Sequence, residues 1–331
     1  MTKRVRLPRG SPLLDIVSLG RRSMSQSRCL SRLEIEHIRR TVNRAPEVMV
    51  KVLSHASHSA KAVRRHLDYI SRKGSLALET DDGQHLKGKV GKTLLDDWAL
   101  ELDELRQHSS LTASFGRKPP KIVHKMIFSM PPGTPPEKVL LAVQRFAASE
   151  FWGKHRYVLV LHTDEPHPHV HLVVQAISVR GERLNIDKAT LRRWRSEFAE
   201  QLRQIGVSAN ATERAVRGQY AKTPRDGAYR AALRGESQSL RHWLQRDATT
   251  SAGSLAQNSS RAVSSFQARD KLIIGWQNVA VQLSRTGEHR LAREVDLFVY
   301  QLRSPSFGPK ALPLSLKAHS SSRSGELERT R

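Results

Sequence analysis

The chain has 331 residues, of which 38% are hydrophobic, so it allows two domains or one core domain with polar flanks. Lysine and arginine number 56 against 31 acidic residues, a formal net charge of +25 that favours a polyanionic partner such as nucleic acid. The single cysteine, Cys29, excludes a disulfide framework and a thiolate metal cluster, and no apolar run is long enough for membrane insertion. The competing interpretation of the charge is a generally basic protein from an arginine-rich proteome.

The start of the chain is predicted to be a basic arm that leads into a folded domain. Residues 1–45 are basic and irregular, with one candidate helix over 30–42. Apolar residues alternate over 47–53, which predicts a strand, and the spacing becomes helical over 57–71. Gly74 is the expected end signal of that helix. The apolar stripe of the helix is formed by Val63, Leu67 and Ile70.

The middle of the chain predicts further helices and one strand. The polar residues 79–92 are expected to form a loop, and 94–106 a helix with one apolar side. Residues 122–130 (IVHKMIFSM) predict a strand, which a Pro-Pro-Gly turn ends. Thr134 is expected to cap the next helix, with Glu137 as its capping-box partner.

The pattern continues with two strands, over 157–162 and 169–177, and a helix over 188–205. This mixture predicts an α+β fold in which helices cover a sheet. The predicted organisation is a flexible basic arm (1–45), the folded domain (46–225), a basic helical extension (226–303) and a disordered basic tail (304–331).

Histidines cluster at the predicted strand pair. The segment HTDEPHPHVH, residues 162–171, holds four of the 15 histidines of the chain. His169 and His171 are two residues apart on a strand, so their rings leave the same face. His162 ends the neighbouring strand and lies close to that pair. The sequence therefore predicts three imidazoles that converge on one point.

Three convergent imidazoles are a typical metal-binding set. Neutral imidazole is the commonest metal ligand, and three nitrogens leave open positions for substrate oxygens. By ligand type Zn, Mn, Fe and Ni all remain candidates. Asp164, in the same loop, is expected either to orient an imidazole or to accept a proton from a nucleophile. His167 stands between two prolines and is expected to lie outside the ligand set. The competing interpretation is a hairpin whose histidines merely tolerate burial.

Three segments resemble one family. HTDEPHPHVHLVV resembles the third motif of conjugative relaxases, in the T-DNA border endonuclease branch of the MobP class and the wider HUH endonuclease group. LDYISRKG is similar to the first motif of that branch, which carries a nucleophilic tyrosine, so the resemblance implies Tyr69 in this role. HKMIFSMPPGT resembles a segment that places a serine near the DNA, which implies Ser129. Gln175 departs from the pattern, because many relatives have Asn there.

The resemblance covers residues 46–225 and implies a central antiparallel sheet flanked by helices, with the histidine pair on its middle strand. It implies a relaxase that nicks one strand at an origin of transfer and later rejoins it. The tyrosine attack yields a 5′-phosphotyrosine and a free 3′-OH during conjugative transfer. Mg²⁺ or Mn²⁺ is the implied cofactor, with Zn²⁺ as a third candidate.

The same resemblance implies partners and a location. The DNA is expected to be single-stranded at the nick region. The implied protein partners are an accessory relaxosome protein and the coupling protein of a type IV secretion system. We expect a cytoplasmic bacterial protein, without membrane insertion, that is exported to the recipient cell attached to DNA.

The local pattern around Tyr69 agrees with an exposed phenol. A phenol has a pKa near 10 and needs nearby cations or a metal to attack a phosphate. Helical spacing places Tyr69 away from the apolar stripe of its helix. The competing interpretation is a boundary tyrosine at the helix edge. Basic side chains expected to contact the DNA backbone are Arg64, Arg65, Arg72, Lys73, Arg192 and Arg193.

Several alternatives stay open from the sequence. The chain can be a rolling-circle replication initiator or a single-strand transposase of the same nuclease group, or a three-histidine zinc hydrolase, which would not need Tyr69. From another class, it can be a non-cleaving DNA-binding accessory or an autoregulator of its own operon.

Overall fold

The computed structural model describes residues 30–53, 58–89, 91–100, 121–219 and 260–303. Within these ranges the chain forms two compact units. The first contains residues 43–212, and the second combines residues 30–42 with the described residues after 212. Much of the predicted arm, extension and tail lies outside the described residues.

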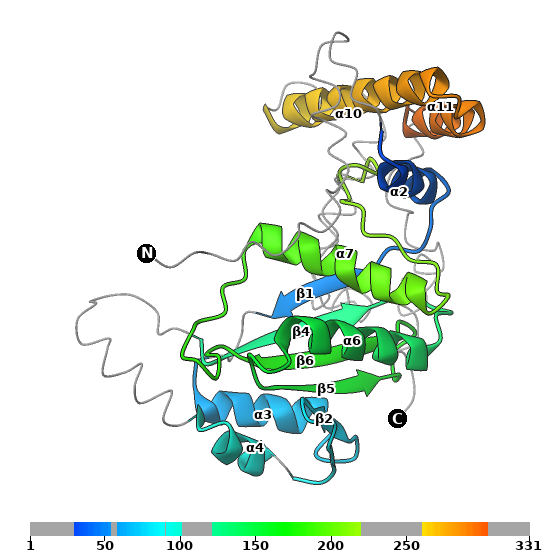
Figure 1. The fold of residues 1–331 in the computed structure, drawn as a ribbon. Helices are drawn as coiled ribbons and strands as arrows, with labels where there is room; N and C mark the ends of the chain where they lie inside the picture. The colour runs from blue at the N-terminus through cyan, green and yellow to red at the C-terminus, as the bar shows by residue number, and fades with distance from the viewer. Residues whose placement is uncertain (1–29, 54–57, 90, 101–120, 220–259, 304–331) are drawn as a thin grey trace, which may run out of the picture. The chain divides into compact units, whose positions relative to one another are not determined.

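The first unit is built on one antiparallel sheet of six strands (Figure 1). In their order across the sheet the strands are β1 (Met49–Leu53), β4 (Val123–Ser129), β6 (His169–Gln175), β5 (Tyr157–His162), β2 (Leu78–Thr80) and β3 (His85–Leu86). Every neighbouring pair is antiparallel. The predicted α+β class, with a central antiparallel sheet flanked by helices, is confirmed.

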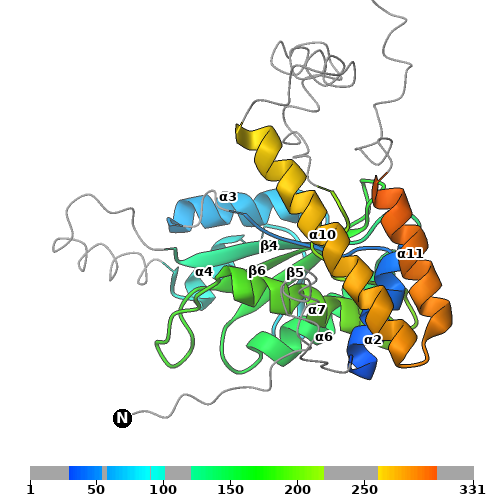
Figure 2. The ribbon, with the colours of Figure 1, turned by 90° about the horizontal axis from the view of Figure 1, so that it is seen from above.

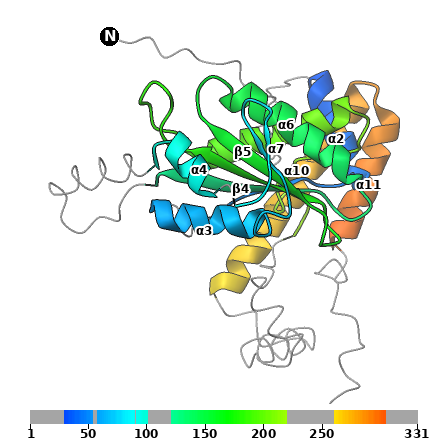
Figure 3. The same ribbon diagram turned by 90° about the horizontal axis from the view of Figure 1, so that it is seen from below.

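Helices cover both faces of this sheet. They are α3 (Ala60–Ile70), α4 (Gly91–Asp97), α6 (Pro136–Phe151) and α7 (Lys188–Gln204). Helices α6 and α7 lie on one side of the strands and α3 on the other (Figures 2 and 3), with α4 packed against α3. Alternate residues of each strand point to opposite faces, so the sheet separates two apolar cores. The larger core contains Phe128, Phe146, Leu172, Trp194 and Phe198, and the smaller contains Val63, Leu67, Ile70, Val160 and Val173.

The sequence patterns located most of these elements to within a few residues, with three corrections. The helix expected over 94–106 begins and ends early: α4 ends at Asp97, and a turn follows in which Ala99 has a φ of 49°, which a continuing helix does not allow. Residues 101–106 of that prediction lie outside the described residues.

Residues 79–92 are not only a loop, because β3 and most of β2 lie there and β2 pairs with β5. Thr134 does not cap α6: its hydroxyl donates to the Pro131 carbonyl at 2.9 Å, and Pro135 occupies the cap position without a side-chain bond. Proline at the start of a helix is favourable because its fixed φ suits the first turn.

The second unit is helical. It contains α2 (Arg32–Val42), α10 (Ser260–Arg285) and α11 (His289–Arg303). Their apolar faces share a core around Ile38, Trp276, Val295 and Phe298, and the Trp276 ring nitrogen donates to the Val216 carbonyl at 3.0 Å. The candidate helix at 30–42 is thus part of a packed unit. Among the described helices, none combines the length and apolar character needed to cross a membrane.

Candidate active site

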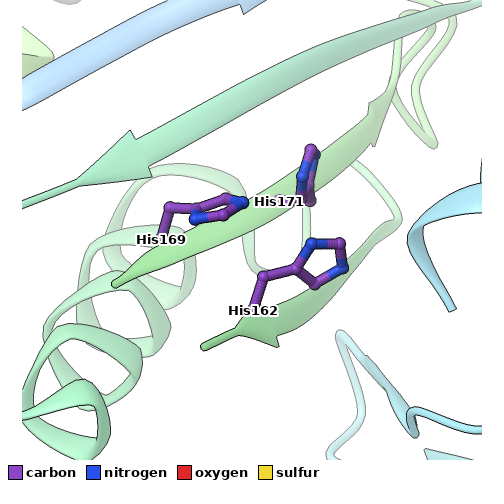
Figure 4. A group of neighbouring side chains, drawn as sticks. All are labelled: His162, His169 and His171. Atoms are coloured by element: carbon purple, nitrogen blue, oxygen red, sulfur yellow. The ribbon is translucent and has the colours of Figure 1, made fainter. Parts of the chain in front are cut away.

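The three histidines meet on the face of the sheet that α3 covers. The antiparallel register pairs His162 of β5 directly with His169 of β6, and His171 follows two residues later on the same face. Figure 4 shows the three rings turned toward one another. The ring centroids are 5.1 Å apart for His162 and His169, 4.6 Å for His162 and His171, and 5.3 Å for His169 and His171. One nitrogen from each ring lies within 4.8 Å of the others.

Backbone carbonyls fix the proton on two of these rings. The Nε2 of His162 lies 2.6 Å from the Ile70 carbonyl, and the Nδ1 of His169 lies 3.0 Å from the His167 carbonyl. A carbonyl only accepts, so each of these nitrogens must carry the hydrogen. The other nitrogen of each ring, Nδ1 of His162 and Nε2 of His169, then keeps a lone pair for a cation. His171 Nδ1 is buried, and the described residues give it no hydrogen-bond partner.

Burial keeps His162 and His171 neutral. The pKa of His171 is lowered to about 3 by burial, with further lowering from His162 and His169. Burial also lowers the pKa of His162, although the bond to the Ile70 carbonyl opposes it. These imidazoles are therefore uncharged at neutral pH, which is the form that binds metals. The donor set, its spacing and its protonation fit a divalent cation.

Helix α3 presents Tyr69 beside this cluster. Val63, Leu67 and Ile70 are buried against the sheet, whereas Tyr69 is 62% exposed on the outer side of the helix. Tyr157, by contrast, is 5% exposed in the larger core, where burial raises its pKa to about 12. Of the two described tyrosines of this unit, Tyr69 is thus the one that both lies near the histidines and reaches solvent.

A left-handed turn follows Tyr69 and returns the chain toward the histidines. Arg72, Lys73 and Gly74 have φ values of 51°, 57° and 94°. Two successive non-glycine residues in this region are unusual and indicate a constrained backbone. A Cβ on Gly74 would lie 2.4 Å from backbone atoms of Gly88, so only glycine fits there.

Arg72 connects the nucleophile candidate to the metal motif. Its guanidinium forms a hydrogen-bonded ion pair with Asp164 and lies 3.3 Å from His162 Nδ1. Its Cζ is 5.3 Å from the centre of the Tyr69 ring. Desolvation opposes ionisation of Asp164, but the bond and charge of Arg72 outweigh it and lower the pKa of this carboxyl. The nearest oxygen of Asp164 is 4.0 Å from His162 Nδ1, so Asp164 holds Arg72 more closely than it holds an imidazole.

Two residues of the site escaped the sequence analysis. The His66 ring lies between Tyr69, at 6.4 Å, and His171, at 6.1 Å. Its Nε2 is buried with no partner among the described residues, and its pKa is lowered to about 4 by burial, then by Lys125 and His162. Lys125 of β4 is 3% exposed, and burial followed by Lys121 lowers its pKa. In the sequence, a lysine within the apolar strand over 122–130 could have indicated that Lys125 belongs to the site.

The remaining predicted residues divide between the two faces. Ser129 is buried on β4 directly opposite His169, and its hydroxyl donates to the Met130 carbonyl at 3.4 Å. Arg64 and Arg65 are exposed on α3. Arg192 and Arg193 lie on α7, on the face away from the histidines. Arg193 pairs there with Glu150 and Glu197, and these bonds raise its pKa further.

An antiparallel sheet that carries converging imidazoles beside an exposed tyrosine defines a class of DNA-processing nuclease domain. Residues 69–207 match the family model of the nuclease domain of MobA/VirD2-like relaxases. Residues 69–207 therefore resemble a relaxase nuclease domain of this type. The match begins at Tyr69 and contains all three histidines of the cluster.

Curated relatives agree with this assignment. The chain is 28% identical over 195 residues to the T-DNA border endonuclease VirD2 of Rhizobium radiobacter, covering 53% of this chain and 44% of that protein. It is 26% identical over 215 residues to the T-DNA border endonuclease VirD2 of Agrobacterium fabrum, covering 60% and 46%. The matched region spans less than half the length of these relatives.

Proposed function

We propose that this chain nicks one DNA strand at an origin of transfer, with Tyr69 as the nucleophile, and later rejoins it during conjugative transfer. The observation that carries the proposal is the connection between Tyr69 and the histidine cluster. Arg72 contacts the Tyr69 ring, the Asp164 carboxylate and His162 together. A zinc hydrolase of the three-histidine type has no use for a phenol held in this way.

His162, His169 and His171 would hold the divalent cation of this reaction. When bound, the cation polarises the scissile phosphate and offsets charge that develops on its oxygens. Imidazole nitrogens suit Zn²⁺ and, as a transition-metal ion of lower affinity, bind Mn²⁺ more weakly, whereas Mg²⁺ prefers oxygen ligands. The donor set therefore favours Mn²⁺ over Mg²⁺.

Tyr69 would supply the attacking oxygen. Its phenol oxygen forms a bond to phosphorus while the bond from phosphorus to O3′ breaks, which leaves a 5′-phosphotyrosine and a free 3′-OH. The exposed phenol can lose its proton to water, and the departing O3′ takes up a proton. Because the phosphodiester is exchanged rather than hydrolysed, the reverse attack by the 3′-OH rejoins the strand.

Arg72 and Asp164 would position and stabilise the nucleophile. A guanidinium over the Tyr69 ring favours the phenolate over the phenol. Asp164 holds that guanidinium, and its lowered pKa makes it a weak base at neutral pH. We therefore assign Asp164 to holding Arg72 rather than to accepting the phenol proton.

DNA is the proposed substrate, and the exposed basic residues near the site, Arg64, Arg65 and Lys73, are proposed to contact its backbone. The proposed protein partners are an accessory relaxosome protein and a type IV coupling protein. We propose that the protein acts in the bacterial cytoplasm and enters the recipient attached to DNA.

The test uses a supercoiled plasmid that carries the DNA beside this gene. Purified protein is incubated with it and Mn²⁺ or Mg²⁺, then denatured and digested. We expect a metal-dependent nick with a blocked 5′ end, lost in Tyr69→Phe and retained in Tyr300→Phe. Tyr300 is a matched control because it is 76% exposed on α11 of the helical unit. A nick that survives in Tyr69→Phe would overturn the tyrosine mechanism and favour a metal hydrolase.

If no nick appears, the same assay is repeated on single-stranded oligonucleotides that span several candidate origins. Binding to all of them without cleavage would support a non-cleaving DNA-binding protein instead.

A further inference from the structure

On the histidine-bearing face of the sheet, α3 and α4 cover only part of the strands. Its apolar core joins α3 and α4 to β2, β4, β5 and β6, and no described residue of β1 takes part in it. On this face of β1, Met49 is 49% exposed and Lys51 is also exposed. Leu53 and, on the neighbouring strand, Ile127 are half-buried. No described helix packs on these four residues, and the surface that they form is named here the β1–β4 surface.

The strand register makes this surface continuous with the histidine cluster. One transverse row of the sheet runs Met49, Ser129, His169 and His162, and the next runs Lys51, Ile127, His171 and Val160. Neighbouring strands are about 5 Å apart, so Met49 and Lys51 lie only about 10 Å across the sheet from His169 and His171, and about 15 Å from His162. The next row brings the positive charge of Lys125 beside Leu53.

Tyr69 approaches the cluster from the opposite direction. Its helix packs over the β5 and β2 side of the same face, and Arg72 links it to His162 on β5. In a phosphoryl transfer the attacking and leaving oxygens lie roughly in line through phosphorus. With Tyr69 on the α3 side, the departing O3′ must therefore point away from α3, toward β4 and β1.

We propose that the β1–β4 surface binds the single-stranded DNA segment that ends in the 3′-OH after cleavage. This inference rests on the proposed function. The apolar side chains offer contact to bases and sugars, while Lys51 offers a cation to a phosphate, as the positively charged groove of a single-strand binding surface does. The other segment, which begins at the 5′ phosphate, leaves on the Tyr69 side.

The surface has a specific consequence for rejoining. After cleavage the 5′ segment is covalently attached to Tyr69, but only non-covalent contacts retain the 3′-OH segment. The β1–β4 surface then determines whether that segment stays near the phosphotyrosine or is replaced by another strand that carries a 3′-OH.

The first test measures binding of two fluorescent oligonucleotides, one ending at the mapped nick and one beginning there. Lys51→Ala is compared with Lys138→Ala, which removes an exposed lysine from α6 on the other face. For the oligonucleotide that ends at the nick, loss of one phosphate contact lowers the log–log salt slope by about 0.7. At ~0.15 M salt this corresponds to about fourfold weaker binding. Binding of the other oligonucleotide is expected not to change.

The second test measures rejoining by the covalent complex. An acceptor that carries the 3′-OH is titrated, and Lys51→Ala is expected to need about four times more of it for half-maximal rejoining. Met49→Glu, which adds a repelling charge, is expected to act in the same direction. Both positions are exposed on an edge strand, and unchanged circular dichroism checks that the variants fold.

The outcomes separate this inference from the proposed function. A wild-type protein without a Tyr69-dependent nick would overturn the function and this inference together. A normal nick with Lys51→Ala indistinguishable from Lys138→Ala, or with only the 5′ segment affected, would overturn the surface alone.

Discussion

The two faces of the central sheet use the same strands in opposite ways. Along β6, Val170, Leu172 and Val174 pack beneath α6 and α7, while His169 and His171 project to the other side. The first face is filled with rings in direct contact, such as Phe128 with Phe146 and Phe198, at 4.9 Å and 5.2 Å between centroids.

The second face places polar groups in contact without satisfying them all. His66 Nε2 and His171 Nδ1 are buried without hydrogen-bond partners among the described residues. Such groups oppose folding, because each loses its hydrogen bonds to water without gaining one in the folded protein. The comparison teaches that the first face contributes most of the apolar packing, whereas the second combines a smaller apolar core with a polar cluster that opposes folding.

The largest predicted effect removes packing from the stabilising face. Leu172→Ala should lower the free energy of unfolding by about 2–5 kcal/mol, through lost burial and the cavity left behind. Denaturant unfolding without metal measures this change. Nicking per folded molecule is expected to remain at low temperature, because the histidines keep their positions. A decrease in the free energy of unfolding of less than about 0.5 kcal/mol would contradict the stabilising role of the face that α6 and α7 cover.

The adjacent residue should give the reverse result. His171→Ala should weaken Mn²⁺ binding by more than about 100-fold, since even changes around metal ligands reach that size. The free energy of unfolding without metal should stay within about 1 kcal/mol of the wild-type value, because the lost packing is offset by removal of a buried nitrogen that has no partner among the described residues. Calorimetric titration with Mn²⁺ and denaturant unfolding measure the two quantities. Unchanged Mn²⁺ affinity would remove His171 from the ligand set.

Local patterns in the sequence were sufficient for the stabilising face and for part of the site. Alternation located β4, β5 and β6, and the spacing of His162, His169 and His171 placed them on one face. These features depend on residues close in sequence or on the register of one hairpin. The two-residue alternation of side chains along a strand is therefore enough to predict them.

The missed features depend on contacts between distant segments. Strands β2 and β3 have only three and two residues, and β2 is defined by its pairing with β5 rather than by a pattern of its own. Arg72 reaches Asp164 across 92 positions, through a turn whose positive φ values no apolar pattern encodes. His66 and Lys125 come together only when α3 packs on the sheet.

Acid should lower the free energy of unfolding through the buried histidines of the α3 side. The pKa of His171 is about 3 in the folded protein against 6.5 for the ordinary imidazole, so below pH 6.5 the unfolded chain binds more protons. Stability is therefore full above about pH 6.5 and falls as the pH drops toward 3. By pH ~5.5 this imidazole alone should lower the free energy of unfolding by roughly 1.4 kcal/mol.

Thermal unfolding across this range, with and without Mn²⁺, measures that dependence. Mn²⁺ should steepen it, because the ion binds neutral imidazoles only. His124, on the other face, also has its pKa lowered to about 4 by burial, so His171→Gln should remove the contribution of His171 and the Mn²⁺-dependent part of the slope, and leave the contribution of His124. A slope that Mn²⁺ leaves unchanged would argue that His171 does not bind the ion.

The smallest effect compares two ion-paired arginines, one from each face. Arg72→Ala removes a cation and a donor to His162 Nδ1, and releases the Asp164 carboxylate. Mn²⁺ should therefore bind about fivefold more tightly, which corresponds to roughly 1 kcal/mol, the interaction of two unit charges about 4 Å apart in water. Nicking should nevertheless slow, because Tyr69 loses the cation beside its ring.

Arg193→Ala is the matched control on the α7 side. It should leave both Mn²⁺ affinity and nicking unchanged and instead lower stability by about 1–3 kcal/mol, because Glu150 loses its charged partner. The opposite signs for metal binding and catalysis in Arg72→Ala distinguish a residue that activates the nucleophile from one that only supports the metal site. If Mn²⁺ affinity and nicking rate both fell in Arg72→Ala, Arg72 would be a structural support of the histidine cluster. The contrast between the two faces would then not hold at this residue.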